Sequence, residues 1–430
     1  MKKPPTLASP ITLPCGAVLP NRIAKAAMTE GLATMDGVPT PELERLYGLW
    51  SDGGAGLLLS GNIQVDRNHL EQPGNVIIDH EPDEALATAL ASWADTATRG
   101  GNAFWAQISH AGRQTPKNVN PSPKAPSAVP LEIPGGRFGV PVELSEFEIH
   151  DIARRFGIAA AACQEAGFTG VQIHGAHGYL ISQFLSPRAN RRTDRYGGEL
   201  RNRARLLLDV LKTIREAVGP DYPVAVKLNS ADFLKGGFAF EDSLQVARWL
   251  EEGGIDLIEI SGGTYEQPKL VGIEGLEEEE AQAVKASTRM REAYFVDFAI
   301  AMQEQVSVPL MVTGGFRQLA VIEEAVKSGA ADVIGLGRPM CVDTDAPRQL
   351  LSGVETLNRY EASLRGLPGW LSFLHHIAPV RVMAAFSTMD WFYAQLDELA
   401  RTGKPRPSLG VLTASRRILR RHARLLKSRD

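Results

Sequence analysis

The chain has 430 residues, 44% hydrophobic and 22% charged, so it can bury a large core and has the composition of an ordinary globular protein. Its 46 basic and 50 acidic residues give a formal net charge of −4, which provides no overall basic field for binding nucleic acid. The cysteines, Cys15, Cys163 and Cys341, lie far apart and support neither a disulfide framework nor a metal or iron–sulfur site. No apolar run follows the lysines at the N-terminus, and none approaches the ~18 residues of a membrane helix. We expect a soluble, cytoplasmic protein.

Short apolar segments alternate with helical ones along most of the chain. Residues 9–23 turn at 14–16 and predict a small N-terminal hairpin. The first strand is predicted to end at 26–29, and the fourth is predicted to begin at 170. The other six are predicted over 56–61, 102–110, 224–229, 257–261, 309–313 and 332–336. Helices are predicted over 41–52, 82–99, 145–166, 200–218 and 241–252. Eight nearly continuous apolar strands alternating with helices predict an α/β fold, a (β/α)8 TIM barrel.

Three stretches depart from this alternation. Residues 115–143 are rich in proline and predict a structured excursion that is not a helix. Residues 265–290 contain the acidic run Glu277–Glu280, which we interpret as a solvated helix start or a lid. After residue 342 the pattern becomes helical, so we expect a barrel at 1–342 and a C-terminal helical extension at 343–430. Aromatic residues of this extension could mediate contact in a homo-oligomer, namely Trp370, Phe373, Trp391, Phe392 and Tyr393. Its basic amphipathic end is expected to be a solvated terminal helix, with docking on an acidic surface or on a partner subunit as the alternatives.

Polar side chains gather at the carboxyl end of the fourth predicted strand. His174, His177 and Tyr179 follow one another there, separated by glycines that permit close approach of the backbone. Two imidazoles and a phenol could hold a polar acceptor and deliver a proton to it. Alternatively, the histidines cap the strand and the tyrosine packs with its hydroxyl satisfied.

Chemistry in such a barrel sits at the carboxyl ends of the strands, and phosphate often binds after strands seven and eight. Glycines occur at those places, Gly314 and Gly315 in one and Gly337 beside Arg338 in the other, and expose N–H groups to phosphate. Lys227 lies inside an apolar strand, where an unpaired ammonium is expensive, so it predicts an anionic partner. That partner is either the edge of a reduced flavin or a barrel carboxylate such as Glu259.

The motif HGAHGYLISQFLSPRANRRTDRYGG, within 174–198, resembles the signature of the Old Yellow Enzyme family of flavin-dependent ene-reductases. The similarity runs from about residue 21 to residue 338. The segment Gln107–Arg113, the segment Gly335–Arg338 and the order of the strands agree with it independently.

The resemblance implies that FMN is the cofactor and that NADH or NADPH gives hydride for reducing an α,β-unsaturated carbonyl or nitro compound. Residues along the isoalloxazine ring or at its edges would be Ala26, Ala27, Met28, Thr29, Gly61, Gln107 and Lys227. The phosphate would be held by Gly314, Gly315, Gly337 and Arg338. His174 and His177 would hydrogen-bond the activating group of the substrate, and Tyr179 would protonate its α-carbon.

The chain departs from the family pattern at four positions. Ala27 replaces a frequent proline, and Lys227 replaces a frequent arginine, both with the implied role retained. Thr29 replaces the redox-tuning cysteine of one subgroup, and Gly31 replaces the tyrosine that closes the pocket there. Three alternatives remain open from the residues: a flavin-dependent oxidative demethylase or dehydrogenase, a non-catalytic flavoprotein, and a flavin-free phosphate-binding barrel lyase or isomerase.

Overall fold

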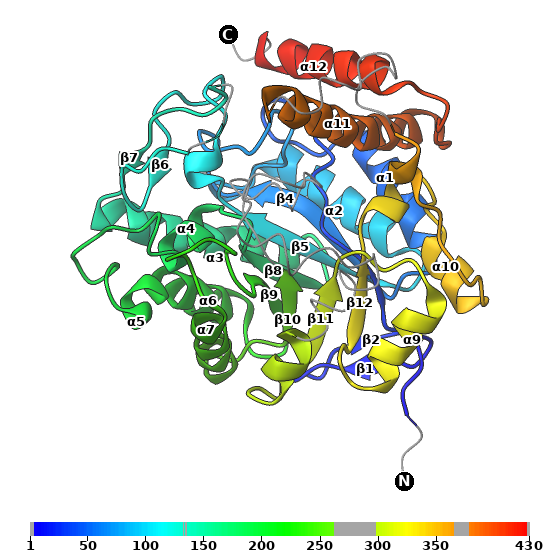
Figure 1. Cartoon of the computed structure of the whole chain (residues 1–430), viewed down its shortest axis with the longest axis horizontal. Helices are drawn as coiled ribbons and strands as arrows, with labels where there is room; N and C mark the ends of the chain where they lie inside the picture. The colour runs from blue at the N-terminus through cyan, green and yellow to red at the C-terminus, as the bar shows by residue number, and fades with distance from the viewer. Residues whose placement is uncertain (1–3, 132, 134–135, 262–297, 365–377, 428–430) are drawn as a thin grey trace.

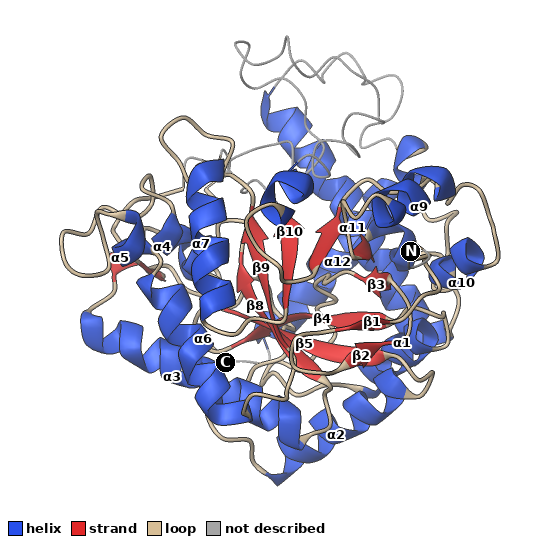
Figure 2. Cartoon of the chain, turned by 90° about the horizontal axis from the view of Figure 1, so that it is seen from below, coloured by secondary structure: helices blue, strands red, loops and turns tan. Residues whose placement is uncertain are grey.

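The computed structural model describes residues 4–131, 133, 136–261, 298–364 and 378–427. Eight parallel strands close into a barrel in the order β10-β11-β12-β3-β4-β5-β8-β9 (Figures 1 and 2). Their bounds are β3 Ile23–Lys25, β4 Leu57–Gln64, β5 Ala103–Ser109, β8 Gly170–Gly175, β9 Val224–Asn229, β10 Leu257–Ser261, β11 Leu310–Thr313 and β12 Val333–Leu336. The predicted (β/α)8 TIM barrel is therefore confirmed.

Helices surround this barrel in the alternation that the sequence predicts. Their bounds are α1 Pro41–Ser51, α2 Glu84–Thr98, α3 Glu146–Glu165, α4 Leu180–Leu185, α5 Leu200–Arg203, α6 Arg205–Val218, α7 Phe240–Glu252, α9 Leu319–Lys327, α10 Ala346–Leu351, α11 Ala378–Thr402 and α12 Val411–Lys427. A capping box starts α3, because the Ser145 hydroxyl accepts from the N–H of Glu148 while the Glu148 carboxylate accepts from the N–H of Ser145.

Successive strand residues point to opposite faces of the sheet, so each strand supplies both the barrel interior and the layer under the helices. Leu57, Leu59 and Trp105 belong to the interior cluster, whereas Leu58 and Phe104 pack with the helices. This two-sided burial explains why the strands read as nearly continuous apolar runs.

The predicted N-terminal hairpin is present as β1 (Ile11–Thr12) paired antiparallel with β2 (Val18–Leu19). Its apolar side chains, Ile11, Leu13 and Leu19, join the interior cluster of the barrel. In Figure 1 the hairpin lies at the opposite end of the molecule from α11 and α12, so one end of the barrel is plugged.

Several predicted boundaries differ from the structure. The strand predicted over 56–61 continues to Gln64 as β4. The first barrel strand ends at Lys25 rather than at 26–29, and Ala26 to Thr29 form the segment that follows it. The helix predicted over 200–218 is divided into α5 and α6 at Ala204, which caps both.

The proline-rich excursion at 115–143 contains two short strands, β6 (Lys124–Ala125) and β7 (Val142–Glu143), which pair in parallel. Backbone hydrogen bonds from Val142 to Pro123 and from Leu144 to Ala125 extend this pairing. The acidic run at 277–280, Trp370 and Phe373 lie outside the described residues.

The C-terminal helices pack on the barrel at α1. Arg45 of α1 donates to the carbonyl of Ala400, and Trp391 belongs to the same apolar cluster as the barrel helices. The basic helix α12 lies on an acidic strip of α11, where Arg417 pairs with Asp397 and Glu398 (Figure 1). The basic segment thus docks on its own chain, and the boundary between 342 and 343 stays a prediction.

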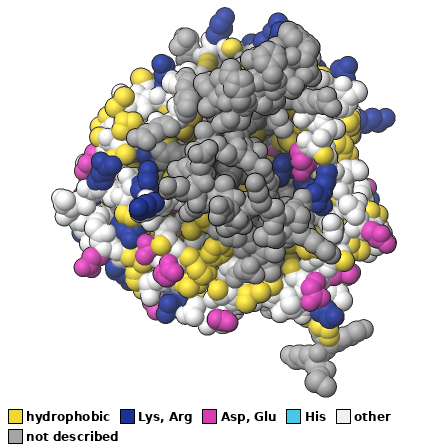
Figure 3. Space-filling model, in the orientation of Figure 1, with side chains coloured by type: hydrophobic (Ala, Val, Ile, Leu, Met, Phe, Trp, Pro, Cys, Tyr) yellow, Lys and Arg dark blue, Asp and Glu magenta, His cyan; other side chains and the backbone are white. Residues whose placement is uncertain are grey.

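In the described ranges, no helix combines the length and the apolar character needed to cross a bilayer. Basic and acidic side chains are interspersed around the rim of the face shown in Figure 3. The visible described surface thus matches the nearly balanced charge of the sequence.

Candidate active site

The three polar residues after β8 meet in one place. His174 is the penultimate residue of β8, and Tyr179 stands at the N-cap of α4. The ring of His174 lies 5.1 Å from that of His177 and 4.8 Å from that of Tyr179, both nearly perpendicular to it. His177 has φ +61°, an uncommon left-handed conformation, and the turn that it makes lets the rings of His177 and Tyr179 both lie against the ring of His174.

The hydrogen bonds of His174 define which of its nitrogens can serve a ligand. Its Nδ1 accepts from the N–H of Ala176 at 3.2 Å, so Nε2 carries the proton in the neutral ring. Burial, followed by the charges of His177 and Lys227, keeps the pKa of His174 well below its usual value. His174 is therefore a neutral imidazole whose Nε2–H can donate. The Nε2 of His177 lies 2.6 Å from Oγ of Ser261, at the end of β10.

A chain of polar side chains crosses the interior of the barrel. Nε2 of Gln107 donates to Gln172 at 2.7 Å, and Gln172 donates to Oε2 of Glu259 at 2.8 Å. Nζ of Lys227 donates to Oε1 of the same carboxylate at 2.7 Å. Lys227 is also the β9 partner of His174 in the sheet. The structure therefore joins the predicted residues Gln107 and Lys227 to the histidine cluster, and the alternative pairing of Lys227 with Glu259 is present.

The predicted phosphate residues lie at the ends of β11 and β12. Gly315 has φ +72°, which favours glycine, and Gly314 precedes it. A Cβ added at Gly337 would meet no other described atom within 4 Å, so the backbone here borders open space. The next residue, Arg338, is about half exposed. The predicted glycines and Arg338 therefore lie at the ends of two paired strands, β11 and β12, which is the arrangement that a phosphate site would use.

Further charged residues, which the sequence reasoning missed, surround this space. Arg317 follows the Gly314-Gly315-Phe316 turn and is 4% exposed, and its Nε has no partner among the described residues. The carboxylate of Glu361 lies 2.9 Å from Arg317 and 3.7 Å from Arg338. Burial, against the attraction of Glu361, lowers the pKa of Arg317, with Arg338 and Arg359 adding to the decrease. Arg317 could have been identified as a candidate phosphate ligand from its place directly after Gly314-Gly315-Phe316. No pattern in the sequence indicates a role for Glu361.

The segment after β3 runs close against Gly61. A Cβ at Gly61 would lie 2.2 Å from Oε2 of Glu30 and 2.6 Å from the carbonyl of Met28, so only glycine fits. The N–H of Gly61 donates to the hydroxyl of Tyr47 at 3.1 Å, which is a contact inside the protein. Sγ of Cys341, three residues after Arg338, lies 3.4 Å from Sδ of Met28. The predicted ring-binding segment therefore borders the predicted phosphate turn.

Glu71, in the loop between β4 and α2, is a second residue that the sequence reasoning missed. Its carboxyl is buried and hydrogen-bonds with Thr29, Asn62 and Tyr179. It therefore connects the segment after β3 with the predicted proton donor. An isolated glutamate in a long loop carries no pattern that would have identified it.

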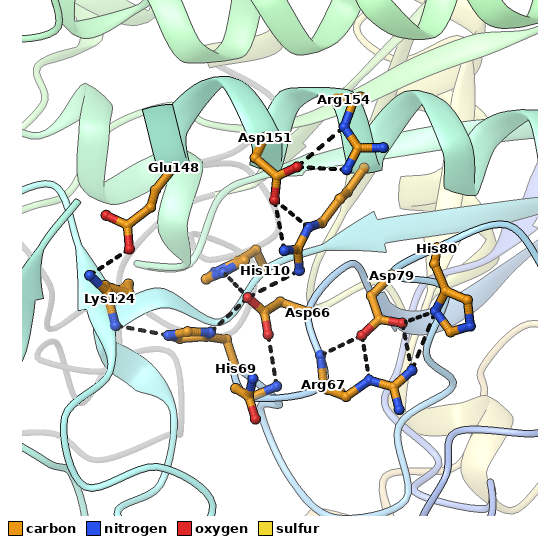
Figure 4. A network of polar contacts seen from close by, with 12 residues as sticks. Asp66, Arg67, His69, Asp79, His80, His110, Lys124, Glu148, Asp151 and Arg154 are labelled. Carbon is orange, nitrogen blue, oxygen red and sulfur yellow. Dashed lines mark hydrogen bonds and ion pairs between the residues drawn. The ribbon is translucent and has the colours of Figure 1, made fainter. Parts of the chain in front are cut away.

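Another polar cluster, formed by Asp66, His69 and His110, could resemble a metal site because their ligand atoms lie within 4.8 Å of one another (Figure 4). However, Nε2 of His69 accepts from the N–H of Lys124 and Nδ1 of His110 accepts from the N–H of Gly112. Each neutral ring then carries its proton on the nitrogen that faces Asp66. A metal needs a lone pair at that nitrogen, so the hydrogen bonds favour a structural network over a metal site.

Several of these groups fit FMN. The space beside Gly337 and Arg338 suits a phosphate, as does Nε of Arg317, which has no partner within the described part of the chain. The buried Lys227 and Gln107 offer a cation and an amide to the polar edge of a ring. His174 offers an N–H donor beside them. The donor set therefore matches a ligand with a phosphate at one end and a carbonyl-rich ring at the other.

Comparison with known proteins agrees with this match. Residues 6–356 match the NADH:flavin oxidoreductase / NADH oxidase family. The NADH-dependent flavin oxidoreductase iliE of Neonectria sp. (strain DH2) is 38% identical over 363 residues, which are 81% of this chain and 47% of that protein. This chain thus spans about half of that relative. The NADH-dependent flavin oxidoreductase iccE of Talaromyces variabilis is 33% identical over 415 residues, covering 93% and 99% of the two chains.

A solved structure shares the fold as well. The Old Yellow Enzyme homologue from Zymomonas mobilis (NCR) superposes with a TM-score of 0.67 at 27% identity, covering 83% of this chain and 96% of that one. The fold and the site therefore define a flavin-dependent oxidoreductase built on a (β/α)8 barrel. The chain belongs to the NADH:flavin oxidoreductase / NADH oxidase family, as the resemblance to Old Yellow Enzymes predicted. It is an enzyme that uses FMN with NADH or NADPH, and the flavin-free lyase or isomerase considered above is excluded.

Proposed function

We propose that this enzyme reduces the C=C bond of α,β-unsaturated carbonyl or nitro compounds. When bound, FMN supplies the redox chemistry by passing hydride from NADH or NADPH to the β-carbon of the substrate. The observation that supports this proposal most strongly is the meeting of a neutral imidazole donor with a phenol, His174 beside Tyr179, at the mouth of the barrel. An activated alkene needs these two groups, one for its oxygen and one for its α-carbon.

His174 and His177 would bind the carbonyl or nitro oxygen of the substrate. Burial keeps the pKa of both rings well below the usual value, so they act as neutral donors. Negative charge grows on the substrate oxygen as the enolate or nitronate forms, and their hydrogen bonds strengthen with it. Lys227, the strand neighbour of His174, would contribute an ammonium to the same region that is already paired with Glu259.

Tyr179 would protonate the α-carbon. Tyr179 is 3% exposed and its ring stands nearly perpendicular to that of His174, so its hydroxyl can face a substrate that the histidine holds. A positioned general acid contributes ~10² to 10⁴ in rate. The tyrosine is held in place because the N–H of Leu180, its neighbour, donates to the carbonyl of His110 at 3.0 Å.

The remaining predicted residues would hold the cofactor. Gly314, Gly315, Gly337 and Arg338 would take the phosphate, now with Arg317. Gln107 and Lys227 would take the polar edge of the ring, with Ala26 to Thr29 and Gly61 alongside it. The partners of the protein are then small molecules, a nicotinamide and an alkene.

Anaerobic mixing tests the proposal. The purified enzyme is reduced with NADH or NADPH and then mixed with cyclohexenone or nitrostyrene, and the absorbance of the flavin is followed. Return of the oxidised spectrum with formation of the saturated product is expected. Bleaching of the oxidised enzyme by an N-methyl amine, without any response of the reduced enzyme to either alkene, would instead support the demethylase alternative.

A further inference from the structure

Glu71 reaches the predicted proton donor from a part of the chain remote in sequence. Three elements converge on its carboxyl: Thr29 from the segment after β3, Asn62 from β4 and Tyr179 from the start of α4. Nδ2 of Asn62 donates to Oε2 of Glu71 and lies 3.5 Å from the hydroxyl of Thr29. The carboxyl therefore has the phenol of Tyr179 as a direct neighbour.

The loop that carries Glu71 is held at both ends. Gln64 at the end of β4 donates to the carbonyl of Val76 and accepts from the N–H of Ile78, at 2.8 and 3.0 Å. The N–H of Gln72, next to Glu71, donates to Oδ1 of Asn75 at 3.1 Å, and Nδ2 of Asn75 donates to the carbonyl of Asn62. The carboxyl is thus placed against Tyr179 by a fixed backbone.

The surroundings of Glu71 favour its protonated form. Burial raises the pKa of Glu71, while the hydrogen bonds from Thr29, Asn62 and Tyr179 oppose the rise. The charged neighbour among its described surroundings, Glu30, has the same sign and is itself paired with Lys25 at 3.2 Å. A buried carboxylate beside a second carboxylate is unfavourable, so these surroundings shift the equilibrium of Glu71 towards the protonated carboxyl.

We propose that Glu71 is the internal proton reservoir that restores the hydroxyl of Tyr179 after each reduction. The proposal rests on the proposed function, in which Tyr179 gives its proton to the α-carbon. The O–H bond of Tyr179 breaks as the new C–H bond forms. The O–H bond of Glu71 then breaks as the phenol is restored, and the carboxylate takes one proton from water. One solvent proton is consumed per alkene reduced, which balances the hydride.

The reservoir predicts a difference between the first and the later turnovers of Glu71→Gln. The amide can hold the tyrosine hydroxyl but cannot give up a proton. Because Tyr179 enters the first turnover protonated, reoxidation of the reduced variant by one equivalent of enone should stay within about twofold of wild type. Steady-state turnover should fall by about tenfold or more, since the phenol must then be reprotonated by a slower route. A purely structural role would slow both phases together.

Two controls accompany this experiment. Glu81→Gln changes an exposed carboxylate further along the same loop and should leave both phases unchanged. Glu71→Asp keeps a titratable group and should recover part of the steady-state rate. An infrared difference spectrum at neutral pH should show a protonated carboxyl band in wild type that is lost in Glu71→Gln, independently of turnover.

Three results would overturn the reservoir. These are an unchanged steady-state rate in Glu71→Gln, a first turnover as slow as the later ones, or no protonated carboxyl band assignable to this residue. If the wild-type enzyme itself is not reoxidised by any alkene, the proposed function fails and the reservoir fails with it. Normal wild-type turnover with an unaffected variant removes the reservoir alone.

Discussion

Nζ of Lys227 lies 2.7 Å from Oε1 of Glu259, and both side chains are buried inside the barrel. The other oxygen of this carboxylate accepts from Gln172, which in turn accepts from Gln107. The sequence left two partners open for the lysine, a flavin edge or a barrel carboxylate. The pair with Glu259 does not exclude the flavin, because an ammonium has three donors and the carboxylate takes one.

Removing one member of this pair should destabilise the protein strongly. Glu259→Gln leaves an ammonium buried without its counter-charge, which typically costs about 3–5 kcal/mol. Urea denaturation of the flavin-free protein measures the change in the free energy of unfolding. The double variant Lys227→Met/Glu259→Gln should recover much of the loss. The exposed pair of Lys212 and Glu216 is the control, since Glu216→Gln should cost less than about 1 kcal/mol. If Glu259→Gln and Glu216→Gln lowered the free energy of unfolding equally, burial would not be what makes the pair of Lys227 and Glu259 important.

Replacing the proposed acid should separate the two half-reactions. Tyr179→Phe retains the ring that packs against His174 but removes its proton, so FMN binding and reduction by NADH or NADPH should be unchanged. Reoxidation by an enone should slow by ~10² to 10⁴, the usual contribution of a general acid. Stopped-flow absorbance measures both steps on one sample. Unchanged reoxidation would remove Tyr179 from the mechanism.

The proposed anchor should affect ligand affinity as well as rate. His174→Ala removes the Nε2–H donor that the hydrogen bond from Ala176 orients. Loss of a hydrogen bond of about 1.5–3 kcal/mol to a developing charge corresponds to about a 10- to 100-fold weaker affinity. Spectral titration of the oxidised enzyme with a substituted phenol, an enolate mimic, measures this change. His80→Ala, at an exposed position, should bind the phenol normally. Intact phenol binding by His174→Ala would argue against the anchor.

The barrel itself could be predicted because its strands are buried on both faces and therefore appear as apolar runs. The start of a helix could also be predicted where the sequence contains its capping residues, as it does with Ser145 and Glu148 for α3. The break at Ala204 between α5 and α6 could not be predicted, because the surrounding residues all have side chains compatible with a helix.

The site was predictable only where its residues follow a strand directly. His174, His177 and Tyr179 come from one turn, so the sequence already places them together. Glu71 and Glu361 come from connecting segments, and their positions depend on tertiary packing. The local sequence pattern does not show which loop lies over the end of which strand. Both residues could therefore be identified only from the folded structure.

The network of Asp66 and His110 should make the protein acid-sensitive (Figure 4). Burial, together with the charge of His69, lowers the pKa of His110 to about 4, against the attraction of Asp66. The unfolded chain, with a histidine pKa of about 6.5, therefore binds this proton more readily than the folded protein does. The resulting stability is fully present above about pH 6.5 and is lost as the pH falls towards 4, a change on the order of 2–3 kcal/mol.

The carboxyl of Asp66 adds to the acid sensitivity at lower pH. Burial alone would raise its pKa, but hydrogen bonds from His110 and His69 hold the pKa well below its usual range. Urea denaturation near pH 7.5 and near pH 5 should show a smaller pH-dependent loss of unfolding free energy in His110→Gln than in wild type. His80→Gln, at an exposed ring, should retain the wild-type dependence. Identical pH dependence of wild type and His110→Gln would show that this histidine does not titrate differently on folding.

The phosphate end should distinguish FMN from riboflavin. Arg338 borders the open space at Gly337 and is placed to form a charge-assisted hydrogen bond of about 1.5–3 kcal/mol with a phosphate. Arg338→Ala should therefore weaken FMN binding to the flavin-free protein by about 10- to 100-fold and leave riboflavin, which has no phosphate, unaffected. Quenching of flavin fluorescence measures both affinities.

A substitution of Glu361 should change FMN affinity in the opposite direction to Arg338→Ala. Its carboxylate pairs with Arg317 and faces Arg338, so it occupies the guanidinium groups that a phosphate would use and repels the phosphate charge. Glu361→Gln removes this charge at constant shape, and FMN affinity should rise by severalfold while riboflavin affinity stays constant. Weaker FMN binding in this variant would mean that Glu361 orients the arginines rather than competing with the phosphate. Equal changes for both flavins would place the phosphate away from these residues altogether.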